Sequence, residues 1–196
     1  MRLLCADITH RDYTSIIDDR SYRRLEETLD DARSKGATVV NLSGDQPGNR
    51  DARKLPLHLV LDTTANMTIR SRETFGPILM VLTYRDPEEV IRYVNGQDRP
   101  LALYPFTNKR ELQDLYIGRI LSGGVTVNDA LYHVGQHDLP FGGVGASGMG
   151  HYHGYEGFVT FSKLRPVFYQ ARFSSLKFLM PPYGKFADRM LGFLTK

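Results

Sequence analysis

Apolar side chains alternate between helical and extended spacing from residue 19 to residue 127, and this alternation constrains the fold more than any other feature. In 19–35, Tyr22, Leu25, Leu29 and Ala32 recur at steps of three and four and form one apolar stripe. Apolar runs typical of strands lie at 37–42, 57–61, 78–84, 101–106 and 125–127. Strands that alternate with helices predict an α/β fold with a parallel sheet.

Two helices in this region carry their own boundary signals. Asp86 is a candidate N-cap, Pro87 suits the first helical position, and Glu89 completes a capping box. Asn108 is expected to cap the next helix, which Gly123 and the glycine after it end. After these elements, 158–170 returns to residues typical of a strand, and 186–194 is a short amphipathic segment that we expect to pack on the protein itself.

Composition excludes several classes of protein. Of 196 residues, 41% are hydrophobic and 24% are charged, which is typical of a folded domain and not of a disordered chain. A single cysteine, Cys5, excludes a disulfide framework and a zinc site made of several cysteines. The sequence shows no apolar run long enough to span a bilayer and no signal-peptide pattern, so we expect a cytoplasmic protein without a transmembrane segment.

The positive charge is concentrated near the C-terminal end. Residues 163–196 contain seven basic residues and one acidic residue, whereas the whole chain has a net charge of +3. A basic segment of this kind is usually a solvated surface, and the alternative is a peripheral site for an anionic surface. No nucleic-acid-binding pattern accompanies it, so no nucleic-acid partner is predicted.

The glycine-rich stretch 128–157 offers two motifs that we interpret conservatively. Residues 143–148 read G-x-G-x-x-G, but the expected strand, helix and downstream acid of a dinucleotide fingerprint are missing. The histidines of this stretch lack a metal-ligand spacing on a common helix, so no metal site is predicted; they are His133, His137, His151 and His153. Cys5 has no base or glycine-rich setting around it and is interpreted as a bystander thiol.

Two motifs then identify a family by resemblance. Glu73-Thr74-Phe75-Gly76-Pro77 resembles the Glu-x-Phe-Gly-Pro motif of the aldehyde dehydrogenase superfamily, and the Pro-Phe-Gly-Gly segment that begins at Pro140 resembles its glycine-rich motif. The Tyr-His-Gly at 152–154 and the Pro-Pro-Tyr at 181–183 are similar to the class 3 branch, and within it to coniferyl aldehyde dehydrogenase-like proteins. The resemblance extends from about Asp12 to the C-terminal tail and corresponds to the C-terminal portion of the family pattern.

The resemblance implies an incomplete three-layer α/β/α parallel-sheet catalytic domain over 1–157, followed over 158–196 by an interface strand and a basic tail. The family's Cys nucleophile and general-base Glu stand in segments that precede this portion, so no catalytic residue is assigned. We therefore expect the 196-residue chain to be inactive alone.

The resemblance also implies roles for three residues. Glu73 would accept hydrogen bonds from the ribose hydroxyls of NAD or NADP, because a carboxylate is a strong double acceptor. Phe75 would pack beside the ribose and nicotinamide. Phe141 would wall the pocket for the aldehyde.

The resemblance leaves three hypotheses for function. The first is a fragment of an NAD(P)-dependent aldehyde dehydrogenase that oxidises an aldehyde, possibly an aromatic one such as coniferyl aldehyde, to its acid. The second is a non-catalytic oligomerisation module, and the third is a surface binder that uses the basic tail. A homodimer or larger self-association is expected, because the family's strand corresponding to Phe158–Tyr169 lies near the subunit interface.

Overall fold

The computed structural model describes residues 7–174 and 180–195 of the chain. The chain divides into two compact units, Met1–Val90 and Ile91–Lys196. Cys5, Lys177 and Lys196 lie outside the described residues, and the expected division at residue 157 remains a prediction.

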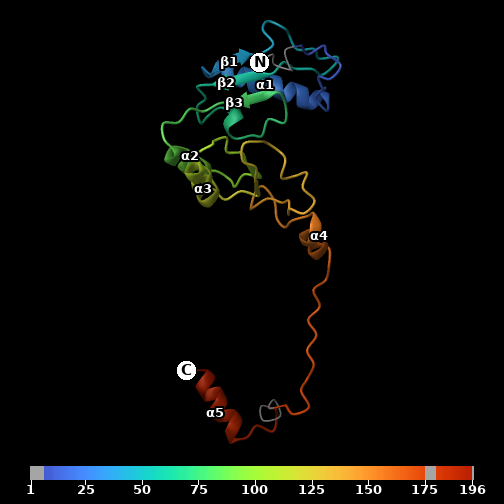
Figure 1. Cartoon of the computed structure of the whole chain (residues 1–196), viewed down its shortest axis with the longest axis vertical. Coiled ribbons are helices and arrows are strands. Elements are labelled where there is room, and N and C mark those ends of the chain that lie inside the picture. The colour runs from blue at the N-terminus through green and yellow to red at the C-terminus, as the bar shows by residue number, and fades with distance from the viewer. Residues whose placement is uncertain (1–6, 175–179, 196) are drawn as a thin grey trace. The chain divides into compact units, whose positions relative to one another are not determined.

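The first unit contains one long helix and a three-stranded sheet (Figure 1). Helix α1 (Asp19–Ser34) begins where the side chain of Asp18 accepts a hydrogen bond from the Ser21 N–H at 2.6 Å. The sheet has the order β1-β2-β3. Its strands are β1 (Thr38–Asn41), β2 (His58–Leu61) and β3 (Ile78–Met80), and a short 3₁₀ helix, η1 (Thr68–Arg70), precedes β3. The β2–β3 pair is parallel, with Leu59 opposite Leu79, and the β1–β2 pair is antiparallel.

The core of this unit lies between α1 and the sheet. The predicted stripe of α1 is confirmed, because its four apolar residues are all buried. They pack in one cluster with Val60 of β2 and Ile78 of β3, together with Ile16, Leu55, Met67 and Ile69. Burial of this stripe is the main stabilisation of the helix, because helical stability in proteins comes chiefly from packing of an apolar face.

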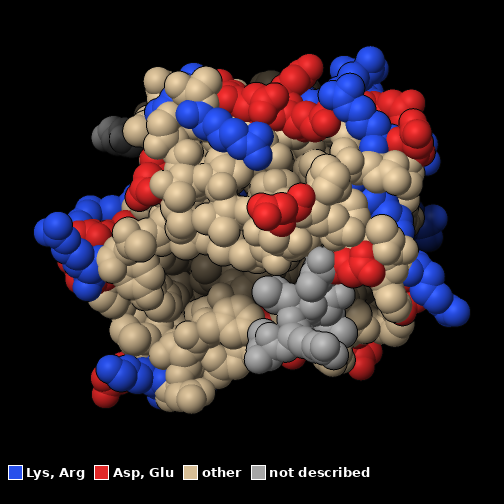
Figure 2. Space-filling view, turned by 90° about the horizontal axis from the view of Figure 1, so that it is seen from above, with Lys and Arg blue, Asp and Glu red and all other residues tan. Residues whose placement is uncertain are grey.

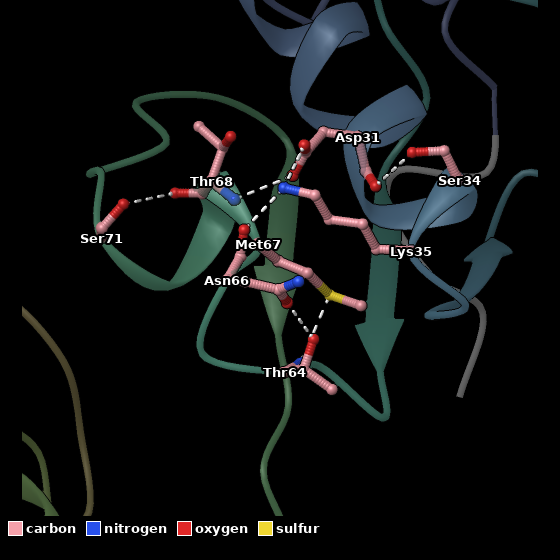
Figure 3. A network of polar contacts seen from close by, with 8 residues as sticks. All are labelled: Asp31, Ser34, Lys35, Thr64, Asn66, Met67, Thr68 and Ser71. Carbon is pink, nitrogen blue, oxygen red and sulfur yellow. Dashed lines mark hydrogen bonds and ion pairs between the residues drawn. The ribbon is translucent and has the colours of Figure 1, made fainter.

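Polar contacts join the C-terminal end of α1 to η1 (Figure 3). One carboxylate oxygen of Asp31 accepts a hydrogen bond from the Thr68 N–H at 2.8 Å, and the other lies 2.6 Å from the Lys35 Nζ. Lys35 Nζ also donates to the Asn66 carbonyl at 2.5 Å. The hydrogen bonds lower the pKa of Asp31, that from Lys35 most strongly.

The second unit contains short strands and helices. Helix α2 (Pro87–Asn95) crosses the division between the units and has the predicted N-cap, because Asp86 accepts from the Glu89 N–H at 3.1 Å. Glu89 accepts from the Arg85 N–H at 3.0 Å, one residue before the N–H that a capping box would use. Strands β4 (Ala102–Leu103) and β5 (Gly124–Val125) pair in parallel, and helix α3 (Arg110–Arg119) lies between them in sequence. Helices α4 (Gly154–Thr160) and α5 (Lys185–Leu194) follow. Within the described residues no helix is long and apolar enough to cross a membrane.

The α/β class with parallel strand pairs is confirmed, and two local predictions are wrong. The start of the expected strand is wrong, because residues 158–160 belong to α4. Residues 163–170 pair with no strand among the described residues, and the interface strand expected there stays a prediction. Asn108 is not the cap of α3, which begins after Lys109, whose N–H donates to the Thr107 hydroxyl at 3.2 Å. Helix α5 covers the predicted amphipathic segment, and Ala187 is its one buried residue within the part described. The expected packing of 186–194 on the protein stays a prediction.

Candidate functional site

The first unit contains a cleft of about 870 Å³. Its walls come from 12–17, from the first turns of α1, from Leu55 and Leu57, and from 72–77. Ligand sites commonly have volumes of roughly 300–1,000 Å³, so the cleft is large enough for a small molecule. On the face of the molecule seen in Figure 2, basic and acidic side chains lie next to one another around the edge, and much of the middle is uncharged.

Two of the predicted site residues line this cleft together. Glu73 and Phe75 stand two positions apart on the loop 73–77 that leads into β3. Both are exposed, and the Phe75 side chain is 77% exposed, which is unusual for so large an apolar group. The φ angle of Phe75 is 45°, in the left-handed region that residues with a β-carbon seldom adopt.

The structure fixes this loop from two sides. The guanidinium of Arg24 in α1 donates to the Glu73 carbonyl at 3.3 Å and to the Thr74 carbonyl at 2.6 Å. On the other side of Phe75, the N–H of His58 in β2 donates to the Pro77 carbonyl at 2.9 Å. The loop is therefore attached to both the helix and the sheet.

The opposite wall, 12–17, is attached to the residues before β2. The Tyr13 hydroxyl donates to the Leu55 carbonyl at 2.6 Å, and the N–H of Ile16 donates to the Arg53 carbonyl at 2.8 Å. Ile16 is buried in the core, whereas Ile17 is 85% exposed. This wall therefore presents an apolar side chain to solvent from a fixed backbone.

The third predicted site residue, Phe141, lies in the second unit. Its N–H and carbonyl pair with those of Tyr152, both at 2.9 Å, which closes the glycine-rich loop 142–151. The Phe141 ring lies 5.3 Å from the ring of Tyr152, 6.2 Å from that of His153 and 5.9 Å from that of His133, measured between centroids. Phe141 is half-buried, so part of the ring remains available for a contact.

As the sequence analysis predicted, the G-x-G-x-x-G of this loop is not a dinucleotide fingerprint. The Ser147 hydroxyl accepts from the Val144 N–H at 2.9 Å and so closes a tight turn inside the motif. Gly143 packs on the backbone of Ser147, where a β-carbon would overlap the carbonyl. No helix follows the motif directly: Gly154 is the first residue of α4. The motif is a folded loop that follows Phe141 in sequence.

Three of the four histidines of this stretch, His133, His137 and His153, contact other aromatic rings. His133 is 7% exposed; its Nδ1 lies 2.9 Å from the Thr126 hydroxyl, and its buried Nε2 has no hydrogen-bond partner within the described part of the chain. The His137 and His153 rings meet edge to face at 5.8 Å. Among the residues that the structure describes, no group of three His, Cys, Asp or Glu side chains is placed to hold a metal ion.

Sequence reasoning missed two residues that shape these sites, Arg24 and His133. Arg24 is half-buried and comes directly before Leu25 of the apolar stripe. A cation next to a buried position in the sequence is only a weak indication that it makes a structural contact. His133 was considered as one of four loop histidines, and its burial beside Phe141 requires the folded loop.

The profile of the aldehyde dehydrogenase family matches residues 6–167, more than three quarters of the chain. The chain belongs to this family. It is 47% identical over 180 residues to a probable coniferyl aldehyde dehydrogenase of Pseudomonas aeruginosa, an alignment that covers 92% of this chain and 37% of the relative. It is 41% identical over 186 residues to the coniferyl aldehyde dehydrogenase of Pseudomonas sp., covering 93% of this chain and 39% of the relative.

Solved structures of aldehyde dehydrogenases share the fold. The substrate-bound state of Staphylococcus aureus AldH matches with a TM-score of 0.72 and 34% identity, over 91% of this chain and 38% of that one. The indole-3-acetaldehyde dehydrogenase AldA of P. syringae, in complex with NAD⁺, matches with a TM-score of 0.67 and 25% identity, over 77% of this chain and 30% of that one. The chain thus spans well under half the length of these aldehyde dehydrogenases.

Proposed function

We propose that this chain supplies the nicotinamide-ribose part of the cofactor site and one wall of the aldehyde pocket of an NAD(P)-dependent aldehyde dehydrogenase. The proposal rests on one observation above all: Glu73 and Phe75 line the same cleft from one anchored loop. The family membership and the coniferyl aldehyde dehydrogenase relatives support oxidation of an aldehyde, with an aromatic aldehyde as the proposed substrate class.

The residues of the cleft fit a nicotinamide ribose. The exposed carboxylate of Glu73 has two acceptor oxygens for the two ribose hydroxyls. The exposed ring of Phe75 offers a flat apolar surface for the sugar and the nicotinamide. The cleft of about 870 Å³ has room for this part of the cofactor.

Each residue then has a defined chemical task. When bound, the nicotinamide accepts a hydride from the substrate. Glu73 holds the ribose, and Phe75 limits the positions that the ring can take. Phe141, supported by Tyr152, His153 and His133, contributes an aromatic wall against which an aromatic aldehyde can pack.

Binding of nicotinamide mononucleotide tests the cofactor half of the proposal. This probe carries the nicotinamide and its ribose without the adenosine half, so it reports on the two contacts proposed here. We expect saturation-transfer NMR to show binding to the intact chain, weakened in Glu73→Gln and in Phe75→Ala, while Glu27→Gln, an exposed carboxylate on α1, binds as the wild type does. Absence of binding to the wild-type chain, or equal binding by all the variants, would contradict the proposal.

We also propose that the 196-residue chain does not turn over aldehyde by itself. Its one cysteine, Cys5, is not in the setting of the family's nucleophile. The test is aldehyde-dependent reduction of NAD⁺ and NADP⁺ with benzaldehyde and coniferyl aldehyde, beside a Cys5→Ala control. Turnover that Cys5→Ala abolishes would show that Cys5 is the nucleophile and that this part of the proposal is wrong.

A non-catalytic oligomerisation module is the second candidate, favoured by one observation. The segment after α4 exposes large apolar side chains, including Phe161 at 88%, Phe168 at 83% and Phe173 at 91%. Large apolar side chains exposed in such number are typical of an interface, and self-association of the chain would cover them. Sedimentation velocity should show a dimer or larger species that Phe168→Asp converts to a monomer; a monomeric wild type would exclude this candidate.

A further inference from the structure

Arg24 makes an unusual contact for a helix cation: it reaches out of α1 and bonds backbone rather than a carboxylate. Its Nη1 donates to the Glu73 carbonyl at 3.3 Å and its Nη2 to the Thr74 carbonyl at 2.6 Å. We infer that Arg24 is a positioning residue that holds the loop 73–77 in the conformation that presents Glu73 and Phe75 to the cleft. The functional meaning of this inference rests on the proposed cofactor role of those two residues.

The loop requires an external anchor because its own contacts are sparse. Phe75 has a φ of 45° and a side chain that is 77% exposed, so packing of its ring does little to hold this backbone. Within the loop, the Ile78 N–H donates to the Gly76 carbonyl at 2.8 Å, and the Thr74 hydroxyl approaches the Ile78 carbonyl at 3.4 Å. These bonds fix the exit of the loop into β3, and Arg24 fixes its entry.

The residue after Arg24 holds the other side of Phe75. Leu25 is fully buried, and Gly76 packs so closely on its side chain that a β-carbon would overlap it. Two consecutive residues of α1 thus hold the backbone before and after Phe75. This arrangement leaves Phe75 as the residue that must project.

The chemistry of the contact is specific to arginine. A planar guanidinium presents two N–H groups in a fixed fork, which suits the carbonyls of two consecutive residues. A lysine ammonium keeps the charge but concentrates its donors on one nitrogen. If Arg24 served only to attract an anionic ligand to the cleft that it lines, lysine would replace it without loss.

The experiment compares Arg24→Gln and Arg24→Lys with Arg23→Gln, which alters an exposed cation at the preceding position of the same helix. The first readout needs no ligand: chymotrypsin cleavage of the Phe75–Gly76 bond in the native chain, followed by mass spectrometry. We expect Arg24→Gln to increase the cleavage rate about tenfold, because the loop opens locally without global unfolding. Arg24→Lys should show a smaller increase, and Arg23→Gln should show none.

The second readout is the dissociation constant for nicotinamide mononucleotide. We expect an increase of about tenfold in Arg24→Gln and a clear increase in Arg24→Lys, because the free loop must be ordered on binding. Binding by Arg24→Lys equal to that of the wild type would overturn the inference, since charge alone would then suffice.

The two readouts separate the possible failures. An unchanged cleavage rate in Arg24→Gln overturns the positioning role even if the nucleotide binds. Absence of nucleotide binding to the wild type contradicts the proposed function, while the cleavage rates still decide whether Arg24 holds the loop. Thermal unfolding of each variant confirms that the helix remains folded, and Arg24→Lys supplies a milder change if Arg24→Gln is unstable.

Discussion

Gly76 lies directly against the side chain of Leu25, so closely that a β-carbon at position 76 would overlap the leucine methyl groups. Leu25 is fully buried in the core of the first unit, so it has little room to move aside. The contact connects the core to the loop that carries Glu73 and Phe75.

Gly76→Ala should therefore reduce the free energy of unfolding by about 1–3 kcal/mol, the usual cost of overpacking a core. Urea denaturation followed by circular dichroism measures this value. The control is Gly118→Ala in α3, where no atom lies within 4 Å of the added carbon. There, alanine should stabilise the helix by up to about 1 kcal/mol. Equal effects at both positions would show that the Leu25 contact is not tight.

The Asp31 network predicts a dependence of stability on acid pH (Figure 3). The hydrogen bonds from Lys35 and Thr68 lower the pKa of Asp31 in the folded chain. The contribution of Asp31 is therefore fully present above the unfolded pKa of about 3.9 and is lost as the pH falls through the lower folded value. Asp31→Asn should lower the urea midpoint at pH 7 and remove this part of the acid dependence.

The matched control is Asp30→Asn, which alters the neighbouring exposed carboxylate that pairs with Arg33 at 3.0 Å. An exposed i,i+3 pair contributes little, so this variant should keep the wild-type pH profile below pH 5. If both variants change the profile equally, the contacts of Asp31 with Thr68 and Lys35 are not its source.

The buried imidazole of His58 predicts a second dependence of stability on pH, closer to neutral pH. Burial lowers the pKa of His58, although the hydrogen bond between its Nδ1 and the Pro56 carbonyl at 2.7 Å acts in the opposite direction. The unfolded chain therefore binds a proton at a higher pH than the folded chain, so stability falls as the pH drops below about 6.5. His58→Gln should flatten the curve of unfolding free energy between pH 7 and the folded pKa. A curve that keeps its wild-type slope in this variant would show that the buried imidazole is not the source.

The contact between Thr126 and the buried imidazole of His133, beside Phe141, is expected to contribute to the free energy of unfolding. Its hydroxyl lies 2.9 Å from His133 Nδ1 and accepts the His133 backbone N–H at 3.3 Å, while Nε2 is buried without a partner in the described part of the chain. Thr126→Val leaves both ring nitrogens unpaired and should cost about 1–3 kcal/mol of unfolding free energy. Denaturation should show a change within about 0.5 kcal/mol for Thr14→Val, an exposed threonine. A similarly small change for Thr126→Val would show that the imidazole does not depend on this hydroxyl.

Apolar spacing and capping residues predicted those elements that are specified by residues close together in the sequence. The stripe of α1 and the Asp86 N-cap of α2 were both confirmed, because spacing and capping act over one or two turns. The antiparallel pairing of β1 with β2 was not predicted, since the sequence of a strand does not specify its neighbour. The interface strand expected over 158–170 depends on the same information, because strand-type residues form a strand only where a partner supplies the hydrogen bonds.

The sequence by itself determined the α/β class, the family and the candidate residues Glu73, Phe75 and Phe141, because motifs and periodicity are properties of consecutive residues. Tertiary structure decided how those residues are held. Arg24 is 49 and 50 positions before the carbonyls that it binds, and His133 reaches Phe141 only through the folded glycine-rich loop. Contacts between residues so distant along the chain depend on how α1 packs and how the loop closes, and no local pattern records them.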